Sequence, residues 1–156
     1  MSEVAELAGK LKSEGEKYAA LFAGMTDDQW TKEVYAEGSA WTVKSILAHL
    51  VTAERGLAKL FANIRDGGSG ASEDFDIDRY NASQQEKTRE LTPQELLGQY
   101  KTVRAGMAAW VSSLDEADLE KTGRHPYQGL TTLREMIKLV YLHNQLHYRD
   151  IKKVLK

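Results

Sequence analysis

Four stretches of this chain carry apolar residues at the spacing that one face of an α-helix requires. They cover residues 3–24, 42–65, 93–113 and 132–155. In each stretch the apolar residues recur every three or four positions, which is typical of a helix that buries one stripe against a core. No segment shows a convincing strand pattern. The sequence therefore predicts an all-α fold, an antiparallel four-helix bundle.

The starts of these helices are marked by capping residues. Thr42, Thr92 and Thr132 each precede an apolar stripe, and threonine is a favoured N-cap. Pro93 suits the first helical position, and the glutamate three residues after Thr92 and after Thr132 completes a capping box. These signals place the helix boundaries from local chemistry alone.

Two connections separate the predicted helices. Residues 66–91 open with Gly67-Gly68-Ser69-Gly70, which breaks a helix, and have room for a short helix over 78–90. The second connection, 115–130, contains Gly123, Pro126 and Gly129. The longer one predicts a bundle with one long crossover.

Composition bounds the function classes. A chain of 156 residues is expected to form a single domain over 1–156, and its net charge of −2 gives no footprint for nucleic acid or an anionic membrane. No apolar run approaches the length of a membrane span, and residues 1–25 lack the apolar centre of a signal peptide. The absence of cysteine excludes thiolate metal sites and a cysteine nucleophile in this sequence. We expect a cytoplasmic protein.

Three histidines are the candidate metal ligands. His143 and His147 are four residues apart, so on a helix they lie about 40° apart around the axis and about 6 Å apart along it. Both imidazoles can reach one ion. His49 lies at the edge of the apolar stripe of the second helix, and it joins the pair if the second and fourth helices are neighbours.

Three imidazoles leave coordination positions open for water or substrate, which distinguishes catalytic from closed structural sites. The donor set suits one divalent metal, zinc or nickel first, with iron and manganese also compatible. The segment His143-Asn144-Gln145-Leu146-His147 lacks the glutamate of the H-E-x-x-H peptidase motif. The competing interpretation is that the histidines are hydrogen-bonded core residues without metal.

Two further side chains are candidates for supporting roles. Asp150 follows His147 by three residues and shares its face, so it could orient a ligating imidazole, or it could be a surface charge paired with Lys153. His125 lies in the second connection, where it could supply a proton or an extra ligand, or simply be solvated.

Several of these segments resemble one family. Residues 41–50, WTVKSILAHL, are similar to a segment of the DinB-like/YfiT-like superfamily of metal-dependent enzymes, and His143-x-x-x-His147 resembles its paired C-terminal histidines. The stretch Gly123-Arg124-His125-Pro126, followed by Gly129, is similar to the family's stretch before its last helix. The resemblance covers nearly the whole chain in order and spacing.

This resemblance implies a four-helix bundle with up-down-down-up connectivity and a metal on His49, His143 and His147. It also implies a small-molecule substrate, a homodimer, and a thiol-dependent S-transferase that uses a low-molecular-weight thiol such as bacillithiol or mycothiol. The alternatives are a metal-assisted hydrolase and a non-catalytic metal-binding or interaction bundle. We expect the substrate pocket at the mouth of the bundle, lined by the connections 26–41, 66–91 and 115–130.

Overall fold

The computed structural model describes residues 2–36 and 40–155. Its four long helices are α1 (Glu3–Ala23), α3 (Val43–Arg65), α5 (Pro93–Ser112) and α6 (Leu133–Val154). Each begins and ends within one or two residues of the predicted position. The N-cap hydroxyls of Thr42, Thr92 and Thr132 accept hydrogen bonds from the backbone N–H three residues later, so the local signals confirm the helix starts.

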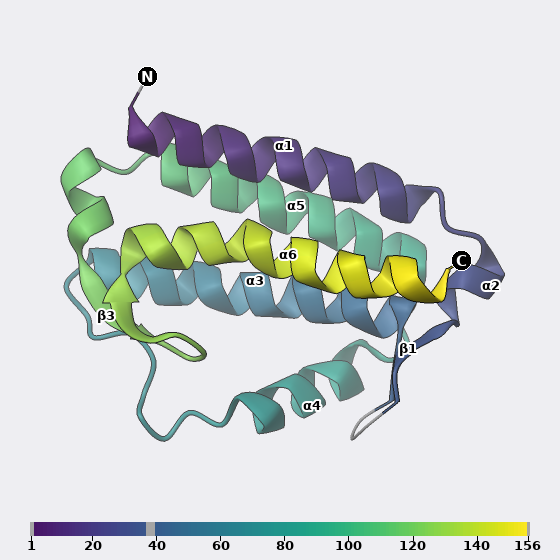
Figure 1. The fold of residues 1–156 in the computed structure, drawn as a ribbon. Coiled ribbons are helices and arrows are strands. Elements are labelled where there is room, and N and C mark those ends of the chain that lie inside the picture. The colour runs from purple at the N-terminus through teal and green to yellow at the C-terminus, as the bar shows by residue number, and fades with distance from the viewer. Residues whose placement is uncertain (1, 37–39, 156) are drawn as a thin grey trace.

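The four helices form a bundle with up-down-down-up connectivity (Figure 1). α1 and α6 run in one direction, and α3 and α5 run in the other. α1 packs on α5 and α6, and α3 packs on the same two helices. Because α3 and α5 are neighbours and parallel, the chain must return along the whole bundle between them, and this return is the predicted long crossover.

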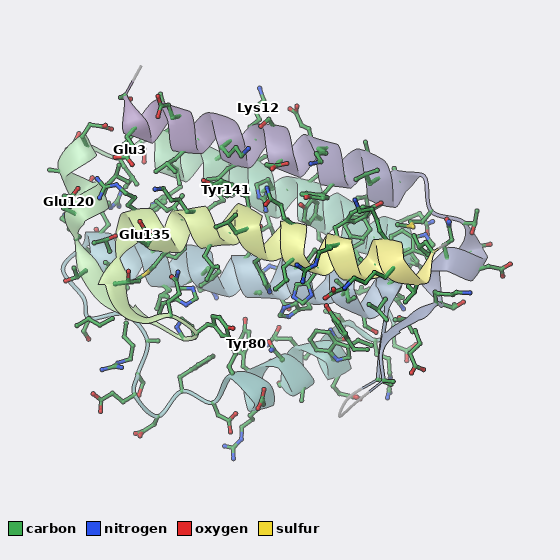
Figure 2. All side chains as sticks on the ribbon, in the orientation of Figure 1. Glu3, Lys12, Tyr80, Glu120, Glu135 and Tyr141 are labelled. Atoms are coloured by element: carbon green, nitrogen blue, oxygen red, sulfur yellow. The ribbon has the colours of Figure 1, made fainter. Side chains whose placement is uncertain are left out.

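The crossover carries a helix of its own, α4 (Ile77–Thr88), within about a residue or two of the predicted 78–90 segment. It lies outside the bundle and packs on α3 (Figure 1). Figure 2 shows Tyr80 pointing from α4 toward the bundle, where its hydroxyl donates to the Thr52 carbonyl oxygen at 3.1 Å. An added Cβ on Gly56 would lie 2.8 Å from that hydroxyl, so the close packing of α4 depends on this glycine.

The expectation that the chain has no strands is wrong. β1 (Glu33–Tyr35) pairs with β2 (Trp41–Thr42), and β3 (Thr122–His125) pairs with β4 (Gly129–Thr132), each as an antiparallel hairpin. The connections also hold a short helix, α2 (Asp27–Trp30), and a 3₁₀ helix, η1 (Glu116–Glu120). Strands of two to four residues are too short to show a period-two pattern in the sequence.

The bundle core is divided into two apolar clusters, one in each half of the bundle. Between them, at mid-height, lie the buried polar side chains of Glu54 on α3, Arg104 on α5 and Asn144 on α6. None of the helices in the described ranges is long and apolar enough to span a membrane.

Candidate metal centre

The three predicted ligands meet at one point between α3 and α6. His49 Nε2 lies 3.1 Å from His143 Nε2, and His147 Nε2 lies 2.8 Å from the same atom. His49 is 7% exposed, and the other two are partly buried. The antiparallel packing of α3 on α6 creates this convergence, as the sequence predicted on condition that the two helices were neighbours.

The nitrogens are spaced as ligands of one ion would be. Candidate ligand atoms of His49, His143 and His147 all lie within 4.8 Å of one another. Two nitrogens bound to one zinc ion at about 2.0–2.1 Å and tetrahedral angles would be about 3.3 Å apart. Hydrogen bonding alone explains the cluster less well, because His143 Nε2 faces two imidazole nitrogens and carries at most one proton. The donor set therefore fits a divalent metal.

The environment keeps the cluster in the neutral form that ligates metal. The pKa of His49 is lowered to about 2. Burial is the largest cause, and the neighbouring His143 and His147 contribute the rest. Burial likewise lowers the pKa of His143 to about 3. Burial also lowers the pKa of His147, although the Asp150 carboxylate opposes the shift. Neutral imidazoles offer the lone pair that a metal needs.

A tyrosine that the sequence analysis missed orients one of the ligands. The Tyr35 hydroxyl donates to Asp150 Oδ2 at 2.6 Å and lies 2.9 Å from His147 Nδ1. A carboxylate only accepts, so the single hydroxyl proton goes to Asp150, and Tyr35 then accepts from an Nδ1–H of His147. This assignment leaves the lone pair of His147 on Nε2, the atom that faces the other two histidines.

Asp150 therefore acts on His147 through Tyr35 rather than by direct contact. The hydrogen bond from Tyr35 lowers the pKa of Asp150, so the carboxylate stays ionised. Lys153 Nζ also lies 3.6 Å from Asp150 Oδ1. Asp150 therefore forms the surface ion pair with Lys153 and the hydrogen bond with Tyr35 at the same time. No local spacing links Tyr35 to residues more than a hundred positions later, so no pattern in the sequence could have identified it.

The first hairpin covers one side of the cluster. Tyr35 comes from β1, and Trp41 from β2 places its ring centroid 4.9 Å from that of His49. The Tyr35 and Trp41 rings lie 6.5 Å apart across the hairpin. The two short strands therefore form part of the site, because they hold two aromatic side chains against the histidines.

His125 lies outside the three-histidine group and is buried rather than solvated. It ends strand β3, is 5% exposed, and its Nδ1 accepts hydrogen bonds from the backbone N–H groups of Tyr127 and Gln128 at 3.0 and 3.1 Å. Burial lowers its pKa to about 4. Of the three alternatives for this residue, the solvated loop histidine is wrong, because the ring is buried against the hairpin.

A groove of about 840 Å³ lies beside the cluster, between α4 and the start of α3. Tyr35, Trp41 and Ala48, the residue before His49, form the wall nearest the histidines. The opposite wall is polar and comes from α4; it includes Asp78, Asn81, Gln85 and Glu86. Residues of the connections 26–41 and 66–91 line this groove, which lies between α3 and α4. The connection 115–130 does not line it, because its hairpin lies at the far end of α3.

Comparison with known proteins places the chain in a family. A family model described as the DinB superfamily matches residues 10–151. This chain belongs to the DinB superfamily. A search of curated proteins gave no significant match to this DinB-superfamily chain.

Solved structures share the fold of this DinB-superfamily member. YfiT from Bacillus subtilis, "a probable metal-dependent hydrolase with an unusual four-helix bundle topology", is similar with a TM-score of 0.74 and 18% identity over 99% of this chain and 87% of that one. An uncharacterised protein from Escherichia coli UTI89 has a TM-score of 0.71 and 15% identity, covering 97% and 90% of the two chains. One from Clostridium difficile 630 has a TM-score of 0.71 and 17% identity, covering 100% and 99%. At such identities the likeness establishes the fold alone.

Proposed function

We propose that this chain is a metal-dependent enzyme that holds one divalent ion on His49, His143 and His147. The observation that carries the proposal is the convergence of three neutral imidazole nitrogens on one point. Zinc and nickel are the first candidates for such a nitrogen donor set, and iron and manganese are also compatible.

The ligand count supports catalysis over a purely structural role. Within the described ranges, the metal-capable group contains three histidines and neither a carboxylate nor a fourth imidazole. Structural zinc sites are filled by four protein ligands, whereas catalytic sites keep a position open. The groove that Tyr35, Trp41 and Ala48 separate from the histidines is large enough to hold a small molecule near the cluster.

The reaction proposed first is transfer of a small thiol to an electrophile. An ion held by His49, His143 and His147 would lower the pKa of a thiol co-substrate, so that the thiolate would be available near neutral pH. The thiol sulfur then forms a bond to an electrophilic carbon, and the leaving group departs with its electron pair and takes up the proton. Since the sequence contains no cysteine, the thiol must come from the co-substrate, and the family resemblance supports this choice.

The chain's own residues would position this chemistry. Tyr35 and Asp150 would fix the tautomer and orientation of His147. Residues that hydrogen-bond to a ligating histidine have the same role in other metal sites. Trp41 and Tyr35 keep bulk water from one side of the cluster. The polar side chains of α4 would contact the substrate from across the groove.

A metal-assisted hydrolase is the second candidate. It is supported by the likeness in fold to YfiT, which is a probable metal-dependent hydrolase. An ion held by the same three histidines would then supply activation of a water molecule in place of a thiol. The two candidates differ in the co-substrate and share the site.

Metal analysis tests the site first. Protein stripped with a chelator and reloaded with zinc or nickel should bind one equivalent per chain, and His147→Ala should bind far more weakly because two imidazoles make a poor site. His125→Ala is the matched control, since it removes the one histidine outside the cluster. Equal metal content in the wild type and in the triple alanine variant of His49, His143 and His147 would refute the assignment.

A reaction screen then separates the candidate activities. Metal-loaded protein is assayed with a panel of thiols and electrophiles, and with ester and amide substrates, beside the His49→Ala variant. Thiol transfer by the wild type alone supports the first candidate, and hydrolysis alone supports the second. Background rates in both assays would favour a non-catalytic bundle. The cytoplasmic location and the homodimer remain predictions; sedimentation at several concentrations tests the latter.

A further inference from the structure

A smaller pocket, of about 200 Å³, lies between α1 and α6. Its lining includes two aromatic and three basic side chains, which are Lys17 and Tyr18 of α1 and Tyr148, Arg149 and Lys152 of α6. His147 and Tyr148 are consecutive on α6, so their side chains leave the helix about 100° apart. The histidines face α3, whereas this pocket faces α1, and the pocket is therefore separate from the proposed metal centre.

The lining of this pocket is positively charged, although the chain as a whole carries a net charge of −2. Among the described residues that line it, three are cations and none is acidic. The buried Glu14 carboxylate lies one turn before Lys17, but its oxygens are already in use. Lys17 Nζ lies 3.5 Å from one of them, and Lys10 and Gln145 contact the other. The pocket thus collects positive charge without an acceptor to spare.

Helix-end electrostatics explains only part of this charge. Cations are stabilised in the last turn of a helix, and Lys152 occupies that turn of α6. Arg149 precedes that turn, and α1 has no basic residue in its own last turn, so neither Arg149 nor Lys17 is placed at a helix end. The Arg149 guanidinium makes one contact, at 3.8 Å, with Asp150, and most of its donors stay available.

The Tyr18 hydroxyl adds a neutral donor to these cations. Tyr18 is 4% exposed. Burial raises the pKa of its hydroxyl, and the charge and a hydrogen bond of Lys17 oppose that rise. An ammonium group can only donate, so the hydroxyl oxygen accepts from Lys17 and its own proton requires a different acceptor.

The chain supplies no such acceptor to Tyr18. Within residues 2–36 and 40–155, the tyrosine hydroxyls that donate to a protein acceptor are those of Tyr35, Tyr80 and Tyr100. In the same ranges, His125 Nε2 is the only fully buried side-chain nitrogen or oxygen atom without a hydrogen bond. The Tyr18 hydroxyl is therefore not enclosed by protein, and it opens onto the pocket that Tyr18 lines.

Two tyrosine rings hold the cations in place and give the pocket an apolar edge. The rings of Tyr18 and Tyr148 lie 5.4 Å apart between the two helices. Lys17 Nζ lies 5.1 Å from the centre of the first ring, and Lys152 Nζ lies 6.0 Å from the centre of the second. Leu21, which is 38% exposed, completes the lining on the α1 side.

We propose that the pocket between α1 and α6 binds a phosphate group through its three cations and the Tyr18 hydroxyl. A phosphate dianion presents several acceptor oxygens to these donors, and arginine and lysine are the side chains that commonly hold it. The phosphate is either the free anion or the end of a small ester whose organic part lies against Leu21. This site does not depend on the proposed function, because it shares no residue with the three-histidine centre.

NMR titration of the full-length ¹⁵N-labelled protein tests the site. The probes are inorganic phosphate, phenyl phosphate and acetate at about pH 8, where phosphate is mainly dianionic, and sodium chloride keeps the ionic strength constant. We expect both phosphates to shift the amide signals of residues 17–21 and 145–152 with dissociation constants of about 1 mM or lower, and acetate to bind at least about tenfold more weakly. Tighter binding of phenyl phosphate would assign the site to an ester, and equal or weaker binding would assign it to the free anion.

Two double variants separate the pocket from the general charge of the protein. Arg149→Gln with Lys152→Gln removes two cations of the pocket and should weaken phosphate binding by at least about tenfold. The matched control, Lys12→Gln with Lys101→Gln, removes two exposed cations elsewhere and should change the affinity by less than about twofold. Figure 2 shows Lys12 pointing away from the bundle. Tyr18→Phe keeps the buried ring, removes only the hydroxyl, and should weaken binding by about tenfold.

Four results would overturn the proposal. The first is the absence of saturable shifts up to about 20 mM phosphate in the wild type. The second is an equal loss in the two double variants, which would show attraction by the overall charge alone. The third is unchanged affinity in Tyr18→Phe, whose amide spectrum also reports whether its fold is intact. The last is a set of shifts centred on the three histidines, which would place the phosphate at the metal centre instead.

Discussion

The buried ion pair at mid-bundle gives the sharpest test of how this fold holds together. Arg104 Nε and Nη2 each donate to a different oxygen of Glu54 at 2.8 Å, and both side chains are 4% exposed. Arg104 Nη2 also donates to Asn144 Oδ1 at 2.9 Å, and Nη1 donates to the Leu11 carbonyl oxygen at 3.2 Å. One guanidinium group therefore joins α1, α3, α5 and α6.

Removing one charge of this pair should lower the free energy of unfolding, because the other charge stays buried without a counter-ion. Glu54→Gln preserves the shape of the side chain but leaves the Arg104 charge without a counter-ion, and losing one partner of a buried pair costs about 3–5 kcal/mol. Arg104→Met should have a similar effect through the unpaired Glu54 carboxylate. The double variant Glu54→Leu with Arg104→Met removes both charges, so we expect it to be more stable than either single variant.

Urea denaturation followed by far-UV circular dichroism measures these free energies. A loss of about 4 kcal/mol lowers the urea midpoint by roughly 2 M for an m-value of about 2 kcal/mol/M. The matched control is Glu86→Gln, which removes the exposed partner of Arg89 and should change stability by less than about 0.5 kcal/mol. Two results would contradict a buried, mutually dependent ion pair. One is a loss of less than about 1 kcal/mol of unfolding free energy in each single variant, and the other is a loss in the double variant equal to the sum of the two single losses.

Three further predictions concern the site and its hairpins. Tyr35→Phe removes the acceptor for the His147 Nδ1–H, so metal affinity should fall about 10–100-fold in a competition titration with a chromophoric chelator, and an unchanged affinity would contradict the orienting role. Burial lowers the pKa of His125 from 6.5 to about 4, so between these values the unfolded chain binds a proton that the folded chain does not. The free energy of unfolding should therefore fall by about 2–3 kcal/mol more in the wild type than in His125→Asn as the pH drops from about 6.5 to 4, and parallel profiles would disprove the shift. Gly123→Val places atoms against Ile64 and should destabilise the fold by about 1–3 kcal/mol in thermal melts, whereas an unaltered melting temperature would mean that the hairpin yields easily.

The sequence by itself determined the long helices and part of the site. The apolar stripes and the threonine caps act within a few residues of one another, so helix boundaries followed from local chemistry. The pairing of His143 with His147 also followed locally, because four residues make slightly more than one helical turn. His49 was placed in the group only on condition that its helix packed beside the last one.

Only the tertiary structure decided the remaining parts of the site. Tyr35 reaches His147 because a two-stranded hairpin turns it back onto α6, and strands this short leave no periodic signal. The burial of His125 depends likewise on a hairpin docked against α3 and α6. The ion pair between Arg104 and Glu54 joins residues that are fifty positions apart in the sequence. They lie on the parallel helices α5 and α3, which the long crossover connects. These contacts depend on which helix faces which neighbour and at what height, and that is set by packing of the whole bundle rather than by any local stretch of sequence.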